Sequence, residues 1–567
     1  MINWYGVFVN GLWVTGLAII LAAVSWSLYA RSLAGRTWLQ QLASPQMSLA
    51  LALGMMLFAL GLAFRPDGRV WRSLLWLMLA LSFALMTWLA DRRRRGLHAE
   101  ARWLLRRQFT GARGMATGLI LLGALMGSMY AVAIRPWMQP DEPRHYEVAM
   151  HNARLGRPGA TSRDLVPAWE QELIADMEAQ SFWWYGYSVI GWDPNNLPKA
   201  FTEIWEPRYS RAFFQLPLYY DLAGLLLYAW GDALTLSQSV IMLRLFGVFW
   251  LVLSLGGIYA MGRELFPQRP QIALAALAFA ALWPSHLAAN AAVNNDPMAE
   301  ALVIWTGFYA IRLLRRGPDF KTLTWFFLLA ILTIYTKRTG FSVLAFLAAI
   351  PLWGLLQVFR RRSRRAKLAG WGVLIAGIMA IPALFYLIQA TGKYWIPESV
   401  IEGLRTGALL QAFQEAPLDK FLITLFRTFW GWFGWLRVPL PDALYLVGAA
   451  VVMALAGLLL LGYLAVFSKG LAGWQRAGLL LLLTALLIQL ALTLGKDVVY
   501  GDWKGGSVPQ MRYLYPVLPA MLLPIFLGLQ RVIPAPKRYL ILPVEVILLL
   551  CFNFYILGFI LYPFFWL

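Results

Sequence analysis

The sequence predicts an all-α polytopic membrane protein, and three observations lead to that class. Of its 567 residues, 60% are hydrophobic and only 14% are charged. The apolar runs are repeatedly close to 20 residues long, roughly the length a helix needs to cross a hydrocarbon layer of about 30 Å. These runs are continuous rather than alternating, and a helix satisfies its own backbone polar groups inside a bilayer. The spans are therefore predicted to be helices and not the strands of a barrel.

In chain order, the apolar runs predict about fourteen transmembrane helices. The first run has no basic segment before it and no cleavage site of the A-x-A type, so we expect a retained helix and not a signal peptide. The predicted spans are 7–30, 46–64, 73–90, 115–134, 240–261, 272–290, 298–313, 323–335, 340–358, 370–390, 443–467, 477–494, 514–530 and 539–562.

Basic residues determine the expected orientation. The chain has 49 Lys and Arg against 28 Asp and Glu, which gives a formal net charge of +21. The two densest arginine clusters, within 91–108 and 359–367, lie between apolar runs. Cytoplasmic loops are enriched in Lys and Arg and face anionic lipid headgroups, so we place both clusters in the cytoplasm. This distribution argues against nucleic acid as the partner, and it leaves both termini outside.

Two further apolar segments are predicted to lie at the outer surface without crossing. Counting 212–230 as a span would invert every later loop and export the arginine cluster at 359–367. The segment 421–435 is rich in Trp and Phe, which suits the headgroup region. Both are predicted to be interfacial or re-entrant helices.

On this threading the chain divides into three parts. Residues 1–114 hold three spans and a basic cytoplasmic loop. Residues 115–390 form a transmembrane core that includes the outer loop 135–239, and residues 391–567 hold an outer loop, the aromatic interfacial segment and the last spans. The outer loop 135–239 is rich in Asp and Glu, and apolar residues recur at helical spacing over 166–181. We therefore expect a small α-rich extracytoplasmic module with an amphipathic helix.

The single cysteine, Cys551, lies within a C-terminal apolar run. One cysteine provides neither a disulfide framework within the chain nor a thiolate cage for a metal. Redox chemistry is therefore not expected.

Asp141 and Glu142 follow the span 115–134 and stand between two prolines. One interpretation is a helix N-terminus, in which Asp141 caps and Pro143 occupies the first turn. The other is a catalytic carboxylate. Partial desolvation at the membrane face would raise its pKa toward the range useful for taking a proton from a hydroxyl.

The outer face also offers a further carboxylate and several cations. Asp296 breaks two apolar runs, so it is either a helix cap or a group that orients a sugar hydroxyl or a metal. Lys337, Arg338 and Arg512 lie at the ends of spans on the side that is normally poor in cations. A bound phosphate would explain them, because charge-assisted contacts to phosphate are strong where water is scarce. The alternative is snorkelling to lipid headgroups.

These groups suit transfer of a sugar from a phosphate leaving group to a hydroxyl. Because nucleotide sugars are confined to the cytoplasm, a donor on the outer face would have to be tethered to the membrane. A polyprenyl-phosphate-linked sugar fits both the cations and the many-helix scaffold.

At these residues the sequence resembles the GT-C membrane glycosyltransferases, the superfamily that includes protein O-mannosyltransferases and the aminoarabinose transferase of lipid A. A bacterial GT-C-like branch of unassigned substrate is the most similar. The resemblance covers roughly 115–530 and is carried by QPDEPRHYE (139–147), FFQLPLYYDLAG (213–224), RELFPQRPQ (263–271), NNDP (294–297), TKRTG (336–340), FWGWFGWLRVPLPD (429–442) and RYLYPVLP (512–519).

The resemblance implies a GT-C-type bundle in a bacterial inner membrane, with an active site on the extracytoplasmic face. Asp141 would act as general base on the acceptor. Glu142 would support it or, with His145, hold a divalent metal. An ordinary hydrogen-bonded histidine is the alternative at His145. Substrate contacts would come from Asp296, Lys337, Arg338, Arg512, Tyr513, His145 and Tyr220.

The sequence departs from the family pattern at both ends. Three spans precede the usual first helix, and the C-terminal part is membrane helix rather than a large soluble domain, so a peptide acceptor is not supported. The predicted function is therefore inverting transfer of a sugar to a hydroxyl of an envelope glycan, lipid or protein. The alternatives are a transporter or flippase of lipid-linked sugars and a non-enzymatic envelope assembly protein.

Overall fold

The computed structural model describes residues 15–22, 50–59, 111–184, 195–204, 216–360, 406–499 and 508–566, apart from isolated positions within these ranges. The chain forms two compact units, Met1–Met115 and Ala116–Leu567. Of the first unit only short helical pieces are described. The predicted span 73–90, nearly all of 370–390, most of both arginine clusters and Arg338 lie outside the described residues.

The described part of the second unit is almost entirely helical, as the sequence predicted. Its longer helices are α6 (Ala112–Ala133), α7 (Glu142–Leu155), α8 (Pro167–Ala179), α11 (Leu218–Trp230), α12 (Leu236–Leu265), α13 (Pro270–Leu282), α15 (Asp296–Arg316), α16 (Phe320–Thr336), α17 (Val343–Arg360), α21 (Leu418–Trp430), α22 (Asp442–Tyr463), α23 (Gly473–Val499), α24 (Leu518–Val532) and α25 (Ile541–Tyr555). Shorter elements are α10 (Phe201–Ile204), η3 (Gly231–Ala233), α14 (Pro284–Asn290), α20 (Ala408–Glu415), β1 (Trp432–Phe433), β2 (Val438–Pro439), η5 (Leu464–Phe467), η7 (Met511–Val517), η8 (Ala535–Leu540), η9 (Ile556–Leu561) and α26 (Tyr562–Trp566).

Seven of the described helices are long and apolar enough to cross a membrane, and a bent pair would make eight. The spans predicted at 115–134, 240–261, 298–313 and 443–467 correspond to α6, α12, α15 and α22 with η5. Those at 477–494, 514–530 and 539–562 correspond to α23, η7 with α24, and η8 through α26. Multi-pass membrane character is thus confirmed, whereas the total of fourteen spans stays a prediction.

The span predicted at 272–290 is not one straight helix. It is broken into α13 and α14, which bend by 64° at Trp283. Pro284 follows the break, and proline disfavours helical backbone at the residue before it and cannot donate a backbone hydrogen bond. Two other predicted spans, 323–335 and 340–358, appear as the shorter apolar helices α16 and α17.

The helix boundaries follow local sequence signals. The side chain of Thr235 accepts a hydrogen bond from the backbone of Gln238 and Gln238 reciprocates, a capping box that starts α12. Pro270 and Pro297 occupy the first turns of α13 and α15, where their missing N–H groups have no helical partner to lose.

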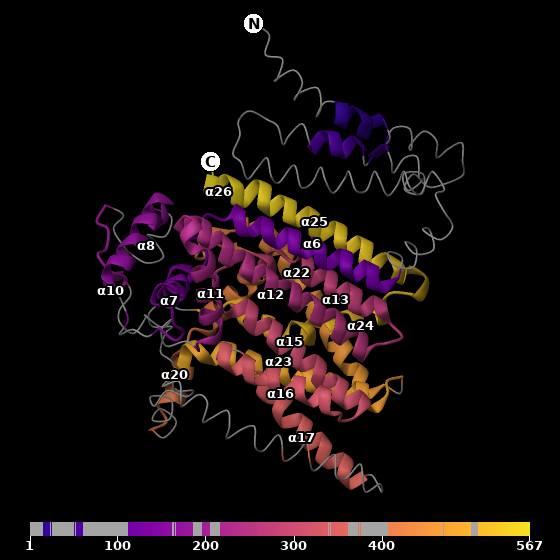
Figure 1. Cartoon of the computed structure of the whole chain (residues 1–567). Coiled ribbons are helices and arrows are strands. Elements are labelled where there is room, and N and C mark those ends of the chain that lie inside the picture. The colour runs from indigo at the N-terminus through magenta and orange to yellow at the C-terminus, as the bar shows by residue number, and fades with distance from the viewer. Residues whose placement is uncertain are drawn as a thin grey trace. The chain divides into compact units, whose positions relative to one another are not determined.

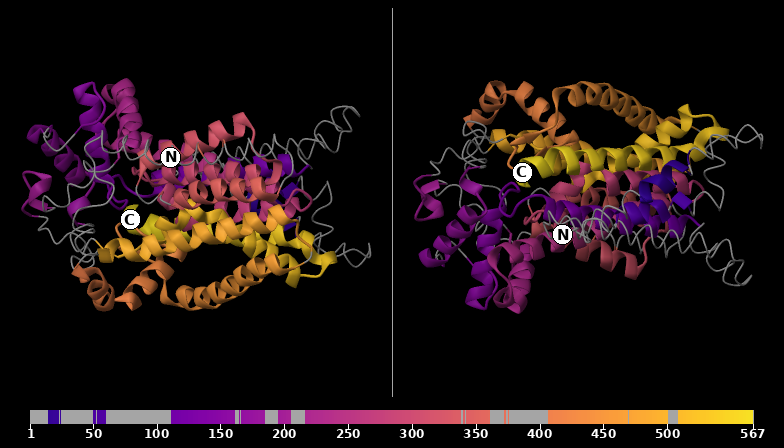
Figure 2. Two further views of the ribbon diagram at one scale, coloured as in Figure 1. Left: turned by 90° about the horizontal axis from the view of Figure 1, so that it is seen from below. Right: turned by 90° about the horizontal axis from the view of Figure 1, so that it is seen from above.

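One end of the bundle carries a small helical module formed by α7, α8, α10 and α11, at the N-terminal end of α12 (Figure 1). The two views in Figure 2 show this module at the same end of the second unit. The helix predicted over 166–181 is confirmed as α8, which buries Leu173, Ile174 and Met177 together with Glu170, and α11 packs against α7. The module therefore brings the 141–155 segment over the ends of the membrane helices.

The two segments predicted to be interfacial form helices too short to span. Both α11 and α21 have 13 residues, or about 20 Å of helix against roughly 30 Å of hydrocarbon. After α21 the chain turns back through the β1–β2 hairpin, in which Trp432 pairs with Pro439 and Phe433 with Val438.

Close helix packing depends on glycine in one place above all. Helices α22 and α24 lie against each other at Gly462 and Gly528. A Cβ on Gly462 would overlap the carbonyl oxygen of Pro524, and a Cβ on Gly528 would overlap that of Leu458. Small residues that let backbones approach are typical of helix pairs in membranes.

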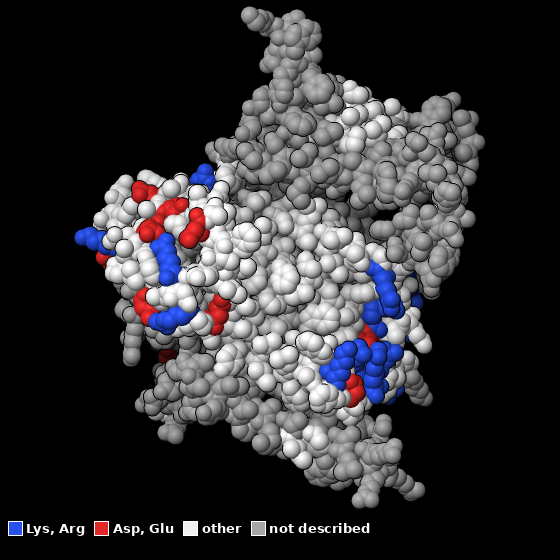
Figure 3. Space-filling view, viewed as in Figure 1, with Lys and Arg blue, Asp and Glu red and all other residues white. Residues whose placement is uncertain are grey.

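Charge is unevenly distributed along the bundle. Figure 3 shows mixed acidic and basic side chains over the module and a concentration of Lys and Arg at the other end of the second unit. The described cations there lie in the last turns of α12, α15 and α24 and in η8: Arg263, Arg315, Arg316, Arg531, Lys537 and Arg538. This asymmetry is the pattern expected of a cytoplasmic face.

Candidate active site

Asp141 occupies the N-cap position of α7, but its side chain makes no capping hydrogen bond. Its backbone is left-handed, with φ 66°, and Trp137 four residues earlier has φ 70°. Such conformations cost free energy in residues other than glycine, and they persist where surrounding contacts hold them. Here the Trp137 indole donates to Asp176 at 2.7 Å, and its carbonyl accepts from the indole of Trp435 at 3.0 Å. The turn thus frees the Asp141 carboxylate from the helix end.

That carboxylate begins a row of alternating charges, which we call the charged quartet: Asp141, Arg512, Asp296 and Lys337. Arg512 Nη2 donates to Asp141 Oδ2 at 2.6 Å, and its Nε lies 3.9 Å from Asp296 Oδ2. Lys337 Nζ lies 2.7 Å from Asp296 Oδ1. The four residues come from four separate parts of the chain, at the start of α7, the start of α15, the end of α16 and η7.

The quartet is buried at one end and open at the other. The side chains of Asp296, Lys337 and Arg512 are 9%, 10% and 8% exposed, whereas that of Asp141 is 40% exposed. Arg512 Nε and Asp296 Oδ2 have no hydrogen-bond partner among the described residues. Buried polar atoms are normally satisfied, so these two are candidates for contact with a ligand.

The asparagines before Asp296 position it. Asn294 Oδ1 accepts from the Asp296 backbone N–H at 2.7 Å. Asn295 Nδ2 donates to the carbonyl of Thr336 at 3.3 Å, which ties the start of α15 to the end of α16. The helix-breaking interpretation of NNDP is correct, because α14 ends at Asn290 and α15 begins at Asp296, whose carboxylate faces Lys337 and Arg512.

Three further predicted residues join the site. His145 Nδ1 lies 2.7 Å from the hydroxyl of Tyr220, and the two rings stack with centroids 5.8 Å apart. The guanidinium of Arg512 lies over the ring of Tyr513, 5.3 Å from its centroid. Contacts of this cation–π type help to hold a buried guanidinium in place.

The electrostatics of Asp141 differ from the sequence-based expectation. Burial raises its pKa, but the positive charge of Arg512 and, to a smaller extent, that of Arg144 outweigh burial and hold the pKa well below its usual range. The prediction of a raised pKa was wrong, because it considered desolvation without the arginine. While Arg512 is bound, Asp141 is a stable anion and a weak base.

His145 is neutral in this setting. Burial first, and then the nearby cation of Lys337, lower its pKa to about 3, although Asp141 and Asp296 act in the opposite direction. A neutral imidazole adds no charge to the quartet, which therefore holds two anions and two cations.

Glu142 points away from the quartet into a clamp with Arg244. Both side chains are fully buried, and the guanidinium donates to the two carboxylate oxygens at 2.8 and 2.6 Å. Arg244 also donates to the carbonyls of Ala131, Ile134 and Arg135 at the end of α6. Glu142 accepts in addition from the backbone N–H of Val293 at 3.2 Å. The clamp thus fixes Asp141 and the segment before Asp296 relative to α6 and α12.

A second buried cluster lies one helical turn below Asp296. His286 Nε2 lies 2.8 Å from Glu300 Oε1, and its Nδ1 lies 2.7 Å from the carbonyl of Ala280. Because a carbonyl only accepts, the contact with Ala280 requires a hydrogen on Nδ1. Asn290 donates to the other Glu300 oxygen at 3.1 Å. Sequence reasoning missed Glu300 and Arg244, although an ionisable residue inside an apolar run is a usable signal.

The metal prediction gains no ligand set from this geometry. Within the described ranges no group of three His, Cys, Asp or Glu side chains is placed to hold a metal ion. Glu142 and His145 do not converge, since one is committed to Arg244 and the other faces Tyr220.

Fold and site together define a polytopic α-helical membrane protein with a charged, partly buried site at the end of the bundle opposite its basic end. Residues 194–521 match the family described as "Predicted membrane protein (DUF2142)", and the chain belongs to that family. The matched region contains Asp296, Lys337 and Arg512, whereas Asp141 precedes it.

A search of solved structures finds similarity to an oligosaccharyltransferase from Archaeoglobus fulgidus, crystallised in complex with Zn and sulfate. The TM-score is 0.38 and the identity 12%, over 77% of this chain. The similarity covers 52% of the oligosaccharyltransferase, so it spans about half of that protein's length. No curated protein matches the sequence.

Proposed function

We propose that this protein is a membrane glycosyltransferase of the GT-C type. It moves a sugar from a polyprenyl-phosphate-linked donor to a hydroxyl of an envelope acceptor, on the extracytoplasmic face of a bacterial inner membrane. The observation that carries the proposal is the charged quartet, in which one accessible carboxylate is held by a buried arginine that has an unused donor.

The quartet is arranged for exchange of partners. A purely structural ion pair in a buried site satisfies all its hydrogen-bonding atoms, as the clamp between Glu142 and Arg244 does. Arg512 instead donates one hydrogen bond to Asp141, and its Nε, 3.9 Å from Asp296 Oδ2, has no hydrogen-bond partner among the described residues. A phosphate offers several acceptor oxygens to a guanidinium fork, so it competes well with a single carboxylate oxygen.

Donor binding then activates the base. When the donor phosphate takes Arg512 and Lys337, Asp141 loses the main charge that lowers its pKa, and burial raises the pKa toward the useful range. The strained backbone keeps the carboxylate accessible during this exchange. Donor and acceptor chemistry are thereby coupled through one residue, Arg512.

The transfer step is a single displacement. The acceptor oxygen attacks the anomeric carbon and its proton passes to Asp141, while the bond from that carbon to the phosphate oxygen breaks. The electron pair leaves with the polyprenyl phosphate, whose charge Arg512 and Lys337 stabilise. Attack opposite the leaving group inverts the configuration at the anomeric carbon.

The charge distribution supports the proposed side. The quartet lies at the module end, and the described Lys and Arg concentrate at the other end of the bundle (Figure 3). With the basic end in the cytoplasm, the quartet faces outward.

The test is transfer by the purified full chain in nanodiscs, supplied with a panel of radiolabelled polyprenyl-phosphate sugars and envelope glycans or lipids. We expect the wild type to transfer label from one donor, and Asp141→Asn to lose transfer while it retains the wild-type resistance to SDS unfolding. Asp232→Asn is the matched control, because Asp232 is exposed in η3 at the same end of the bundle.

Two outcomes would contradict the proposal. Undiminished turnover by Asp141→Asn would remove the base from the mechanism. Donor translocation across the bilayer that persists in Asp141→Asn, without any transfer by the wild type, would identify a carrier.

A further inference from the structure

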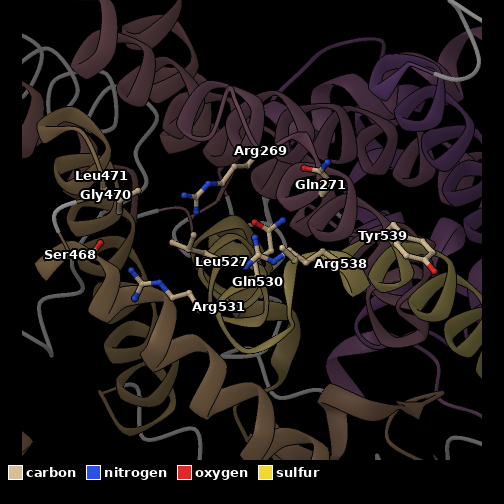
Figure 4. Close-up of a pocket in the computed structure, with 11 residues that line it drawn as sticks. Arg269, Gln271, Ser468, Gly470, Leu471, Leu527, Gln530, Arg531, Arg538 and Tyr539 are labelled. Atoms are coloured by element: carbon tan, nitrogen blue, oxygen red, sulfur yellow. The ribbon is translucent and has the colours of Figure 1, made fainter.

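A second site lies at the basic end of the bundle. A cavity of about 700 Å³ opens there between the α12–α13 turn, the segment before α23, the end of α24 and η8. Arg269, Arg531 and Arg538 line the cavity from three different elements, and Figure 4 shows the Arg531 side chain extending toward the side of Ser468. None of the residues that line it is acidic.

The arginines are underused as donors. Arg531 Nη1 and Arg538 Nε each donate to a single backbone carbonyl, at 3.3 and 3.1 Å. The guanidinium of Arg269 has no hydrogen bond or ion pair with any side chain of the described residues. Glu264, the acidic residue of the preceding helix turn, already accepts from Arg315 and Arg316. Three positive charges therefore face the cavity without a counter-charge from its lining.

The walls of the cavity are held in place. Gln475 Nε2 donates to the carbonyl of Leu265 at 2.8 Å, and Gln475 Oε1 accepts from the backbone N–H of Ala472 at 2.9 Å. These bonds tie the segment before α23 to the end of α12. On the other wall Gly528 packs against α22 within one turn of Arg531. The arginines are thus presented by rigid elements, which lowers the entropic cost of binding.

We propose that this cavity is a phosphate-binding site, which takes the phosphodiester of an anionic phospholipid or a soluble phosphate anion. Arginine forks match phosphate oxygens, and basic pockets between membrane helices at the cytoplasmic side bind anionic headgroups. The helix ends at Leu265, Val532 and Phe467 place the cavity where a bilayer's phosphates would lie.

This site is separate from the charged quartet. Helix α15 begins at Asp296 in the quartet and ends at Arg316 near the basic end, and its 21 residues span about 30 Å. The proposed phosphate site therefore does not depend on glycosyl transfer, and a negative result for either proposal does not contradict the other.

The experiment uses the full chain in phosphatidylcholine nanodiscs with increasing fractions of phosphatidylglycerol. Native mass spectrometry counts retained anionic lipids, and calorimetry in phosphatidylcholine alone measures binding of inorganic pyrophosphate. We expect Arg269→Gln to lower the affinity for the ligand that occupies the site about tenfold, as loss of a charge-assisted contact predicts. Arg269→Lys should fall between this variant and the wild type, because it keeps the charge and loses the fork.

Lys321→Gln is the matched control, because Lys321 is exposed in the first turn of α16 at the same end and does not line the cavity. Unchanged binding by this control, with loss in Arg269→Gln, supports the site. If Arg269→Gln retains less phosphatidylglycerol, the ligand is a lipid headgroup. If it binds pyrophosphate more weakly, the ligand is a soluble phosphate. Equal losses in Lys321→Gln and Arg269→Gln would show a diffuse surface effect and overturn the proposal. The proposal would also be overturned if the wild type bound neither phosphatidylglycerol nor pyrophosphate. Should Arg269→Gln fail to fold, Arg538→Gln takes its place.

Discussion

The clamp between Glu142 and Arg244 makes a quantitative prediction about stability. In Glu142→Gln the amide oxygen can still accept from Arg244 Nε. The amide NH2 group, however, would face Arg244 Nη2, which is also a donor, where the carboxylate accepts a hydrogen bond of 2.6 Å. Arg244 keeps its bonds to three carbonyls but loses the carboxylate with which it pairs among the described residues. Removing one partner of a fully buried ion pair costs about 3–5 kcal/mol, so we expect a loss of that size.

The assay is unfolding by SDS in mixed micelles, followed by tryptophan fluorescence, for Glu142→Gln, Arg244→Met and the double variant. The double variant should recover part of the loss, because it leaves no unpaired charge. A loss below about 1 kcal/mol in Glu142→Gln, or losses that add without coupling, would refute the clamp. If Glu142→Gln were as stable as the wild type but transferred no sugar, Glu142 would instead have a direct role in catalysis.

Three further predictions follow from individual contacts. Arg512→Lys should raise the KM for donor about tenfold, since a lysine cannot make the bidentate contact. An unchanged donor KM would leave Arg512 as a structural partner of Asp141 without a role in donor binding. Gly462→Ala should destabilise the protein by about 1–3 kcal/mol, because the added Cβ would overlap Pro524 where α22 contacts α24. Gly457→Ala is the control, since no atom lies within 4 Å of its added Cβ, and equal effects of the two substitutions on SDS unfolding would contradict this packing. Burial lowers the pKa of His145 from 6.5 to about 3, so below pH 6.5 the unfolded chain binds a proton that the folded chain does not, and the free energy of unfolding should fall by at most about 1.4 kcal/mol per pH unit. His145→Gln should flatten this dependence on pH, and an unaltered slope would argue against a buried neutral His145.

Much of the membrane architecture could be predicted from the sequence because hydrophobicity alone determines it. The runs at 240–261 and 443–467 became long helices, and Pro284 in the predicted span 272–290 was a visible signal for the break that the structure contains. The thirteen-residue length of α11 agrees with its exclusion as a span, an inference that came from the positive-inside rule.

The sequence pointed to four residues that lie together in the structure, but it did not predict their electrostatics. Asp141, Asp296, Lys337 and Arg512 do converge, but no local pattern shows that Arg512 binds a carboxylate 371 positions away and reverses the direction of its pKa shift. The partner of Glu142 was equally distant, at Arg244, so adjacent acidic residues that looked like one functional pair have different roles. Long-range pairing of charges depends on tertiary packing, which residue spacing does not contain.

The central claim is that the charged quartet receives the donor phosphate and releases Asp141 in doing so. An experimental structure of the full chain with a polyprenyl-phosphate sugar tests it most directly. We expect the phosphate within hydrogen-bond distance of Arg512 and Lys337, with the contact between Arg512 and Asp141 broken and the Asp141 carboxylate facing the anomeric carbon. A donor bound elsewhere, with the 2.6 Å contact between Arg512 and Asp141 intact, would contradict the account.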